Sequence, residues 1–254
     1  MVKKVIIAAA GRGTRMLQLS KDKPKHLIEV NGKPFLSYLL DNLFFAGYKD
    51  IVLVVGYMPE IMEAFVKSYV APEKGDFKIE IINQFDSFDF NEKNGTACPL
   101  MCVKNINEKF LYISGDNFYS IEDLKSINIE DDFNYVSGVE NDHPENFGVL
   151  VSKGEFLTEI IEKPLPAKIS EINLGGQEEF VGNLINVSLY KFTPEIFEKI
   201  SEIKKSPRGE YEITDAVSLL AKEKKVKINK IKGFWMDFGR PEDVKKLSKF
   251  LKSN

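Results

Sequence analysis

The segment 8–15, with the sequence AAAGRGTR, has the composition of a phosphate-binding loop. Gly11 and Gly13 permit backbone conformations and close approaches that side chains would block. Backbone amides of such a loop can point at phosphate oxygens, and the forked guanidinium of Arg15 can bridge two of them. The loop is neither a dinucleotide fingerprint, because Met16 replaces the third glycine, nor a Walker A loop. A tight turn between a strand and a helix explains the same residues equally well.

A second cluster of positive charge lies at 23–27, with the sequence KPKHL, where Lys25 follows Arg15 by ten residues. Two basic groups near one glycine-rich loop suit a polyphosphate ligand. Taken alone, Lys21, Lys23 and Lys25 would more often belong to a solvated loop. The cluster therefore favours a nucleotide site only together with the loop before it.

Two aspartates each follow an apolar stretch. Asp116 comes soon after the apolar run 110–113, and Asp237 comes directly after 234–236. In open α/β sheets, ligands bind at the carboxyl ends of the strands. Each aspartate alone would more often be a turn or helix-capping carboxylate.

The pair Glu162-Lys163 also has two interpretations. An exposed ion pair at a strand end would contribute under about 1 kcal/mol. In a binding role, Glu162 would accept hydrogen bonds from ligand hydroxyl groups, and Pro164 would end the strand and help to fix both side chains. Gly148 would let a ligand lie against backbone or would be an ordinary bulge glycine. Core packing explains the single tryptophan, Trp235, as well as a binding role does.

Periodic apolar patterns predict the elements that position these residues. In the first half, strands are predicted at 5–10, 51–55, 77–82 and 110–113, and helices at 34–46, 59–69 and 96–103. This alternation indicates a parallel sheet covered on both faces. In the second half, strands are predicted at 135–139, 147–151, 157–161 and 180–190, and helices at 194–203, 213–223 and 241–251. A mixed strand order is therefore expected there.

The composition predicts a well-cored α/β domain spanning 1–254, with a nucleotide-binding half up to about residue 120 and an acceptor-binding half beyond it. With 43% hydrophobic and 29% charged residues, the chain is neither disordered nor collagenous. A net charge of −3 argues against a broad basic face for nucleic acid, and no apolar run is long enough to span a membrane. Cys98 and Cys102 are expected to be small buried thiols, compatible with a reducing cytoplasm.

Together these motifs resemble the sugar-1-phosphate nucleotidyltransferases, especially the glucose-1-phosphate thymidylyltransferases and uridylyltransferases. The resemblance covers nearly the whole chain as motifs in the family's order: 10–15 with 24–25, Gln84 with 95–97, 115–117, 147–149, 162–164, Asn186, 208–215 and 235–239. Any one of them would be a weak match, but the ordered set argues against chance.

The resemblance implies a Rossmann-like α/β fold with a mixed, mainly parallel sheet and helices on both faces. It implies transfer of a nucleotidyl group from an NTP, with dTTP or UTP favoured, to a sugar 1-phosphate, with glucose 1-phosphate favoured, releasing pyrophosphate. It also implies Mg²⁺ bound by Asp116 and Asp237, which would hold the α-phosphate for in-line attack. Because the attacking phosphate oxygen is already ionised, no Ser–His dyad is needed, and His26 and His143 both lie in loop-like segments.

The resemblance further assigns roles to individual residues. The nucleotide-binding residues would be Ala8, Ala10, Gly11, Gly13, Thr14, Arg15, Gln84, Gly95 and Thr96. The residues that bind the sugar phosphate would be Gly148, Glu162, Lys163, Asn186 and Arg208. The catalytic residues would be Arg15, Lys25, Asp116, Lys163 and Asp237. The expected partners are the two substrates, with neither nucleic acid nor a membrane, in a cytoplasmic protein for which a homo-oligomer is compatible with the family.

The sequence departs from its relatives at the acidic, aromatic stretch 85–94, which bears on base selection, and at Ser188, where many relatives have glycine. The chain ends at Asn254 without a hexapeptide-repeat tail, so a second, acyl-transfer activity is not expected. Three alternatives stay open. They are a cytidylyltransferase or guanylyltransferase with another phosphorylated acceptor, a catalytically silent nucleotide-sensing homologue, and, less favoured, an NAD-dependent oxidoreductase.

Overall fold

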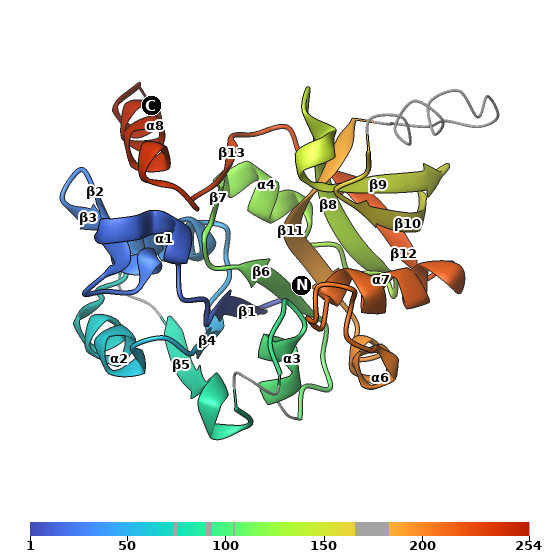
Figure 1. Cartoon of the computed structure of the whole chain (residues 1–254), viewed down its shortest axis with the longest axis horizontal. Helices are drawn as coiled ribbons and strands as arrows, with labels where there is room; N and C mark the ends of the chain where they lie inside the picture. The colour runs from blue at the N-terminus through green and yellow to red at the C-terminus, as the bar shows by residue number, and fades with distance from the viewer. Residues whose placement is uncertain (74–75, 90–92, 104, 166–182, 254) are drawn as a thin grey trace.

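The computed structural model describes residues 1–73, 76–89, 93–103, 105–165 and 183–253. Within these residues, a mixed sheet of nine strands, in the order β5-β4-β1-β6-β11-β8-β12-β10-β9, runs through both halves of the chain (Figure 1). The expected α/β fold, with a mixed sheet, is confirmed.

The first four strands of this sheet are parallel. They are β5 (Lys78–Asn83), β4 (Asp50–Val55), β1 (Lys4–Ala9) and β6 (Phe110–Ser114). Their register places Ile7 of β1 opposite Leu53 of β4 and Ile113 of β6. Apolar runs of this kind are typical of strands buried on both faces. The four predicted strands are therefore confirmed, with ends that differ by at most one residue.

Alternate residues of β1 enter different hydrophobic cores, because successive side chains of a strand point to opposite faces. Val5 and Ile7 pack with α1 (Phe35–Phe45), α2 (Pro59–Ser68) and α4 (Ile121–Ser126). Ile6 packs in a second core formed with α3 (Cys98–Cys102), α6 (Ile196–Glu202) and α7 (Ile213–Lys222). Helices therefore cover both faces, as predicted (Figure 1).

The second half has the mixed strand order that the sequence predicts. Strand β11 (Leu184–Phe192) is antiparallel to both β6 and β8 (Asn134–Glu140), and β12 (Val226–Lys230) is parallel to β8. At the far edge, β10 (Phe156–Glu162) is antiparallel to β12 and to β9 (Gly148–Lys153). Residues 180–182 of the predicted strand 180–190 lie outside the described residues.

Several short elements escaped the sequence-based prediction. Besides β12, they include α4, the two-stranded ribbon of β7 (Asn117–Tyr119) with β13 (Trp235–Asp237), and the small hairpin β2 (Glu29–Val30) with β3 (Lys33–Pro34). The ribbon and hairpin share a third core with the predicted C-terminal helix, α8 (Pro241–Ser253).

The helix predicted at 96–103 shortens to α3. Its first residues instead join the distant segment before α7, because the backbone N–H of Ala97 donates to the carbonyl of Tyr211 at 2.9 Å. No helix in the described part of the chain is long and apolar enough to cross a membrane.

Candidate active site

Two neighbouring cavities lie at the carboxyl ends of β1 and β6, where α/β sheets place ligands. The first, here called the loop cavity, has a volume of about 390 Å³ and lies against the glycine-rich loop. The second, here called the strand cavity, has a volume of about 300 Å³ and lies among β6, β9, β10 and β11. The two cavities share four lining residues: Ala8, Thr96, Ser114 and Asp116.

The loop cavity collects nearly all of the residues predicted to bind the nucleotide. Its lining includes Ala8, Ala10, Gly11, Gly13, Thr14, Lys25, Gln84, Gly95 and Thr96, whereas Arg15 lines the strand cavity. Of the two loop glycines, Gly13 has a φ of +64°, and a Cβ there would lie 2.9 Å from Cβ of Lys25. A Cβ on Gly11 would meet open space, so nothing in the described structure requires glycine there.

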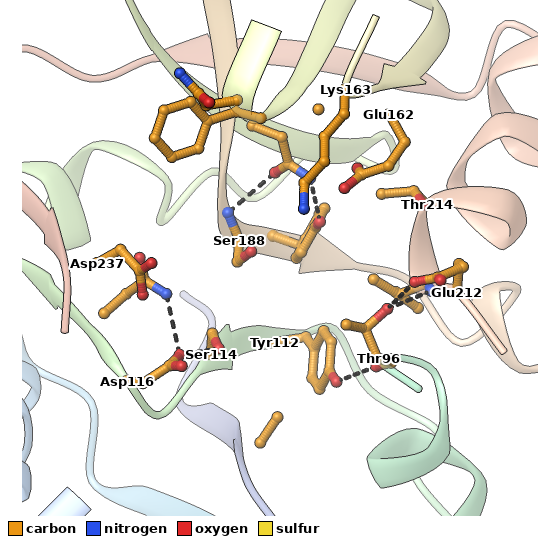
Figure 2. Close-up of a pocket in the computed structure, with 18 of the residues that line it drawn as sticks. Thr96, Tyr112, Ser114, Asp116, Glu162, Lys163, Ser188, Glu212, Thr214 and Asp237 are labelled. Carbon is orange, nitrogen blue, oxygen red and sulfur yellow. Dashed lines mark hydrogen bonds between the residues drawn. The ribbon is translucent and has the colours of Figure 1, made fainter. Parts of the chain in front are cut away.

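The strand cavity brings together the residues predicted to bind the sugar phosphate. Its lining includes Gly148, Glu162, Lys163, Asn186 and Arg208, together with Asp116 and Asp237. Figure 2 shows the two aspartates on one side of this cavity and Glu162 and Lys163 across from them. The side chain of Asn186 is held at both ends, because its amide donates to the Tyr190 hydroxyl at 2.6 Å and its carbonyl accepts from the Ser188 backbone at 3.0 Å.

The two aspartates approach each other although 120 residues separate them in the chain. Asp116 lies in the turn that joins β6 to β7, and Asp237 is the last residue of β13. The antiparallel ribbon places Asp237 opposite Asn117, the residue after Asp116. Asn117 itself donates to the Asp116 carboxylate at 3.2 Å and accepts from the Trp235 indole at 2.8 Å. This short ribbon therefore places both carboxyl groups in one cavity.

The two carboxyl groups have opposite pKa shifts. Burial alone would raise the pKa of Asp116, but the ammonium of Lys25 and the hydroxyl of Ser114 hold it well below its usual range. Burial and the negative charge of Asp116 raise the pKa of Asp237 to about 6. No described residue donates a hydrogen bond to the Asp237 carboxylate. Two crowded carboxylates of this kind resist ionising together unless a cation lies between them.

The carboxylate pair fits a Mg²⁺ ion, which prefers hard oxygen ligands and few protein ligands. Among the described residues, no group of three or more His, Cys, Asp or Glu side chains could hold a metal. Substrate oxygens would therefore have to complete the coordination of an ion held by Asp116 and Asp237.

Several side chains differ from their expected settings. Lys25 forms an ion pair with Asp116, and His26, expected in a loop-like setting, is 1% exposed. Arg208 pairs with Glu212 at 2.8 Å and lies 3.7 Å from Glu162. The described structure thus neutralises two of the predicted anion-binding side chains with carboxylates of the site itself.

The structure adds lining residues that the sequence did not single out. They are Tyr112, Ser114, Asn146, Tyr190, Glu212 and Thr214 in the strand cavity, and His26, Asn94 and Glu210 in the loop cavity. Glu210, Glu212 and Thr214 belong to the quoted motif 208–215, and Ser114 directly precedes the motif 115–117, so their positions near Arg208 and Asp116 were available as a signal. Tyr112 and Tyr190 carried no such signal, because each reads as an ordinary core residue of a strand. Trp235 lines the strand cavity and also packs against a hydrophobic core, and a binding role for it stays a prediction.

The cysteines stay outside this site. Cys98 and Cys102 are both free and buried, as predicted. Burial raises the pKa of Cys98 to about 12 and that of Cys102 to about 11, so neither thiol is a ready nucleophile.

The two cavities thus meet at Asp116, with Asp237 lining one of them and the glycine-rich loop lining the other. The family model for nucleotidyl transferases matches residues 4–254. The chain therefore belongs to this family.

The chain is also similar to individual members of the family. The chain is 35% identical over 247 residues to the UTP–glucose-1-phosphate uridylyltransferase AglF of Haloferax volcanii, covering 94% of this chain and 92% of AglF. It is 34% identical over 253 residues to the bifunctional protein GlmU of Methanocaldococcus jannaschii, covering 97% of this chain and 53% of GlmU. The chain thus spans about half the length of GlmU. A crystal structure of UDP-glucose pyrophosphorylase with UDP-glucose has the same fold, with a TM-score of 0.80, 23% identity and full coverage of both chains.

Proposed function

We propose that this chain transfers the uridylyl or thymidylyl group of UTP or dTTP to a sugar 1-phosphate, with glucose 1-phosphate as the favoured acceptor. The observation that carries the proposal is the junction of the two cavities at Asp116, with Asp237 beside it. The relative that this chain nearly spans, AglF, is named for UTP and glucose 1-phosphate, which supports this substrate pair.

In this mechanism the NTP lies in the loop cavity with its α-phosphate near Asp116, and the sugar phosphate lies in the strand cavity. Arg15 and Lys25 hold the NTP phosphates, and Lys25 moves from Asp116 to them when the nucleotide binds. Lys163 and Arg208 hold the sugar phosphate. Glu162 accepts hydrogen bonds from sugar hydroxyls, and the amide of Asn186 donates to them. Positioning and charge neutralisation then account for catalysis.

A phosphate oxygen of the sugar 1-phosphate attacks the α-phosphorus in line, the new P–O bond forms, and pyrophosphate leaves with the electron pair of the broken bond. Asp116 and Asp237 would hold Mg²⁺, which supplies charge neutralisation at the α-phosphate when bound. This reaction needs no general base, because the attacking phosphate oxygen is already ionised near neutral pH.

We further infer that residues 1–254 act as one domain, because β11 of the second half pairs directly with β6 of the first. The activity would supply activated sugars for polysaccharide synthesis in the cytoplasm.

The test measures pyrophosphate release with each of UTP, dTTP, CTP, GTP and ATP against a panel of sugar 1-phosphates, with Mg²⁺ and with EDTA. We expect turnover with UTP or dTTP and glucose 1-phosphate that EDTA abolishes. Preference for CTP or GTP would reassign the base, and no turnover with any pair would favour a catalytically silent homologue.

A further inference from the structure

Strands β7 and β13 form a ribbon that has no turn of its own, because β7 ends at Tyr119 and β13 begins only at Trp235 (Figure 1). Each strand has three residues, and a two-stranded ribbon is marginally stable in water. The ribbon nevertheless carries Asp237 in β13 and follows directly after Asp116. Contacts outside the ribbon must therefore help to hold its two strands in register.

The register of this ribbon sets the position of one aspartate relative to the other. In the observed register Asp237 lies opposite Asn117, and the backbone N–H of Phe238 donates to the Asp116 carbonyl at 2.7 Å. Successive side chains of a strand point to opposite faces, so a slip of one residue would turn the Asp237 carboxylate to the other face of the ribbon. A metal site that uses both aspartates thus depends on how β13 is held against β7.

At the other end of the ribbon, the side chain of Asp123 holds the segment that leads into β13. Asp123 is 4% exposed and lies in the first turn of α4, which begins two residues after β7 ends. Its Oδ1 accepts from the backbone N–H of Lys232 at 3.1 Å and from that of Gly233 at 3.0 Å. Its Oδ2 accepts from the Ser120 hydroxyl at 2.8 Å. Both oxygens of this buried carboxylate therefore hold residues 232–233 beside the end of β7.

The same segment passes so close to α4 that no side chain fits at Gly233. A Cβ there would collide with Oγ of Ser120 and would lie 2.5 Å from Oδ2 of Asp123. The Ser120 hydroxyl cannot easily give way, because it also caps α4 by accepting from the Asp123 backbone at 3.1 Å. The missing side chain and the two backbone hydrogen bonds are separate observations of one tight contact.

We propose that Asp123 is a positioning residue for the metal site. By binding the backbone of residues 232–233, it takes the place of a turn between β7 and β13 and fixes Asp237 beside Asp116. Asp123 lines neither cavity, so it acts through β13 and not by contact with a substrate. This inference rests on the proposed function, which takes the two aspartates as the ligands of Mg²⁺.

The test is the binding of Mn²⁺, as a probe for Mg²⁺, to the whole chain in the presence of UTP. Water proton relaxation rates measure it, because they rise when Mn²⁺ joins a slowly tumbling protein. Asp123→Ala should weaken Mn²⁺ binding about tenfold, the low end for loss of a group that supports metal ligands. The loss is partial because Met236 and Phe238 still hold β13 in the third core. Asp123→Asn keeps a carbonyl oxygen for the two backbone N–H groups and should stay within about threefold of the wild type.

Asp131→Asn is the control for a loss of stability alone, since Asp131 lines neither cavity and pairs with the buried Lys191. It should lower the free energy of unfolding in urea and leave Mn²⁺ binding at the wild-type value. Gly233→Ala disturbs the same contact as Asp123→Ala while keeping the carboxylate, so it decides the question if Asp123→Ala does not fold.

Two outcomes would overturn the inference and leave the proposed function standing. They are wild-type Mn²⁺ affinity in a folded Asp123→Ala or Gly233→Ala variant, and an equal loss of affinity in Asp131→Asn. Wild-type protein that bound no Mn²⁺ in the presence of UTP would overturn both the inference and the proposed function.

Discussion

At the scale of single residues, the carboxylate of Asp116 interacts with several polar side chains of the site. Its carboxylate pairs with Lys25, accepts from Ser114 and Asn117, and borders both cavities. Burial and the negative charge of Asp116 raise the pKa of its neighbour Asp237 to about 6. Because the pKa of Asp237 is raised and that of Asp116 is lowered, a cation entering this site would change the protonation of Asp237 more than that of Asp116.

Asp116→Asn should therefore abolish metal-dependent turnover, with a loss of about 10²–10³-fold or more, similar to removal of one charge-stabilising group in other enzymes. Pyrophosphate release measures the loss, and circular dichroism checks that the fold persists. The exposed Asp142→Asn is the matched control. A rate near that of the wild type would remove Asp116 from the metal site.

Lys163 lies across the strand cavity from the two aspartates (Figure 2). Lys163→Ala should raise KM for the sugar 1-phosphate by about tenfold or more while leaving KM for the NTP nearly unchanged, because a charge-assisted contact to the acceptor phosphate is lost. Steady-state kinetics with each substrate varied in turn measure both constants. Lys21→Ala, on the exposed part of the loop, should leave both unchanged. A larger effect on the NTP would assign Lys163 to the nucleotide instead.

His26 gives the protein a specific sensitivity to acid. Its pKa is about 3 when folded, against a normal value of 6.5, so the unfolded chain binds a proton first as the pH falls. Its contribution to stability is therefore complete above pH 6.5 and is lost progressively towards pH 3. Between pH 6.5 and 4.5 the loss is about 2–3 kcal/mol. Urea unfolding at several pH values should show this fall in the free energy of unfolding for the wild type. An equally steep fall in His26→Leu would show that His26 is not its cause.

At the scale of elements, β11 contains an irregularity that shapes the strand cavity. Its pairing with β8 shifts register between Asn186 and Tyr190, and Ser188 within this bulge has a φ of +55°. Bulges of this kind redirect side chains next to active sites. Glycine suits this backbone conformation better than serine does.

Ser188→Gly should relieve this backbone strain and raise the free energy of unfolding by about 0.5–1 kcal/mol, since the left-handed conformation costs an L-residue about 1–2 kcal/mol and glycine returns part of it as chain entropy. Urea denaturation measures the change. The neighbouring Val187, which is fully buried, provides the contrast, because Val187→Gly should be clearly destabilising. Equal or lower stability in Ser188→Gly would show that contacts of the hydroxyl outweigh the strain.

The elements differ in how far the sequence predicts them. The long apolar runs of β1, β4 and β6 predict buried parallel strands because few other structures bury such runs. The Lys-rich β12 and the three-residue strands β7 and β13 have too little apolar periodicity to be recognised, and they form through pairing with distant segments. For the site, the residues of the quoted motifs line two neighbouring cavities, and their roles stay predictions. The motifs could not predict that Lys25 and His26 are buried, because their burial depends on packing across the fold.

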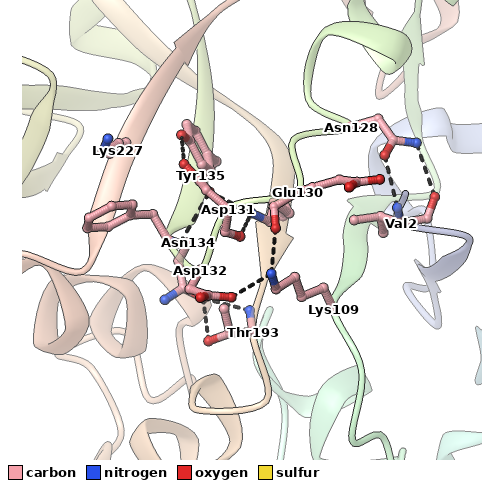
Figure 3. A network of polar contacts seen from close by, with 12 residues as sticks. Val2, Lys109, Asn128, Glu130, Asp131, Asp132, Asn134, Tyr135, Thr193 and Lys227 are labelled. Carbon is pink, nitrogen blue, oxygen red and sulfur yellow. Dashed lines mark hydrogen bonds and ion pairs between the residues drawn. The ribbon is translucent and has the colours of Figure 1, made fainter.

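At the scale of the whole molecule, a polar network lies at the ends of the strands that are remote from the site (Figure 3). Lys191, at the end of β11, is fully buried and donates to the carbonyl and carboxylate of Asp131 at 2.6 and 2.9 Å. Lys109, just before β6, donates to the Glu130 carbonyl at 2.6 Å and pairs with Asp132. The network thus joins strands from both halves of the chain at the end remote from the cavities.

Asp131→Asn should lower the free energy of unfolding by about 2 kcal/mol, because the buried ammonium of Lys191 loses its counter-charge but keeps a carbonyl partner. The double variant Asp131→Asn/Lys191→Met should recover part of this loss, since no buried charge is then left unpaired. Urea denaturation gives both values. Kinetic constants should stay at wild-type values, and a change in KM would show that this network reaches the active site.

Strand β11 comes from the second half of the chain, yet it completes the hydrogen bonding of β6 in the first. A fragment ending near residue 120 would therefore present β6 as a bare sheet edge flanked by apolar side chains, a surface prone to pairing with other molecules. Expressing the two halves separately, to study nucleotide binding apart from acceptor binding, would first require another strand to pair with β6 in place of β11.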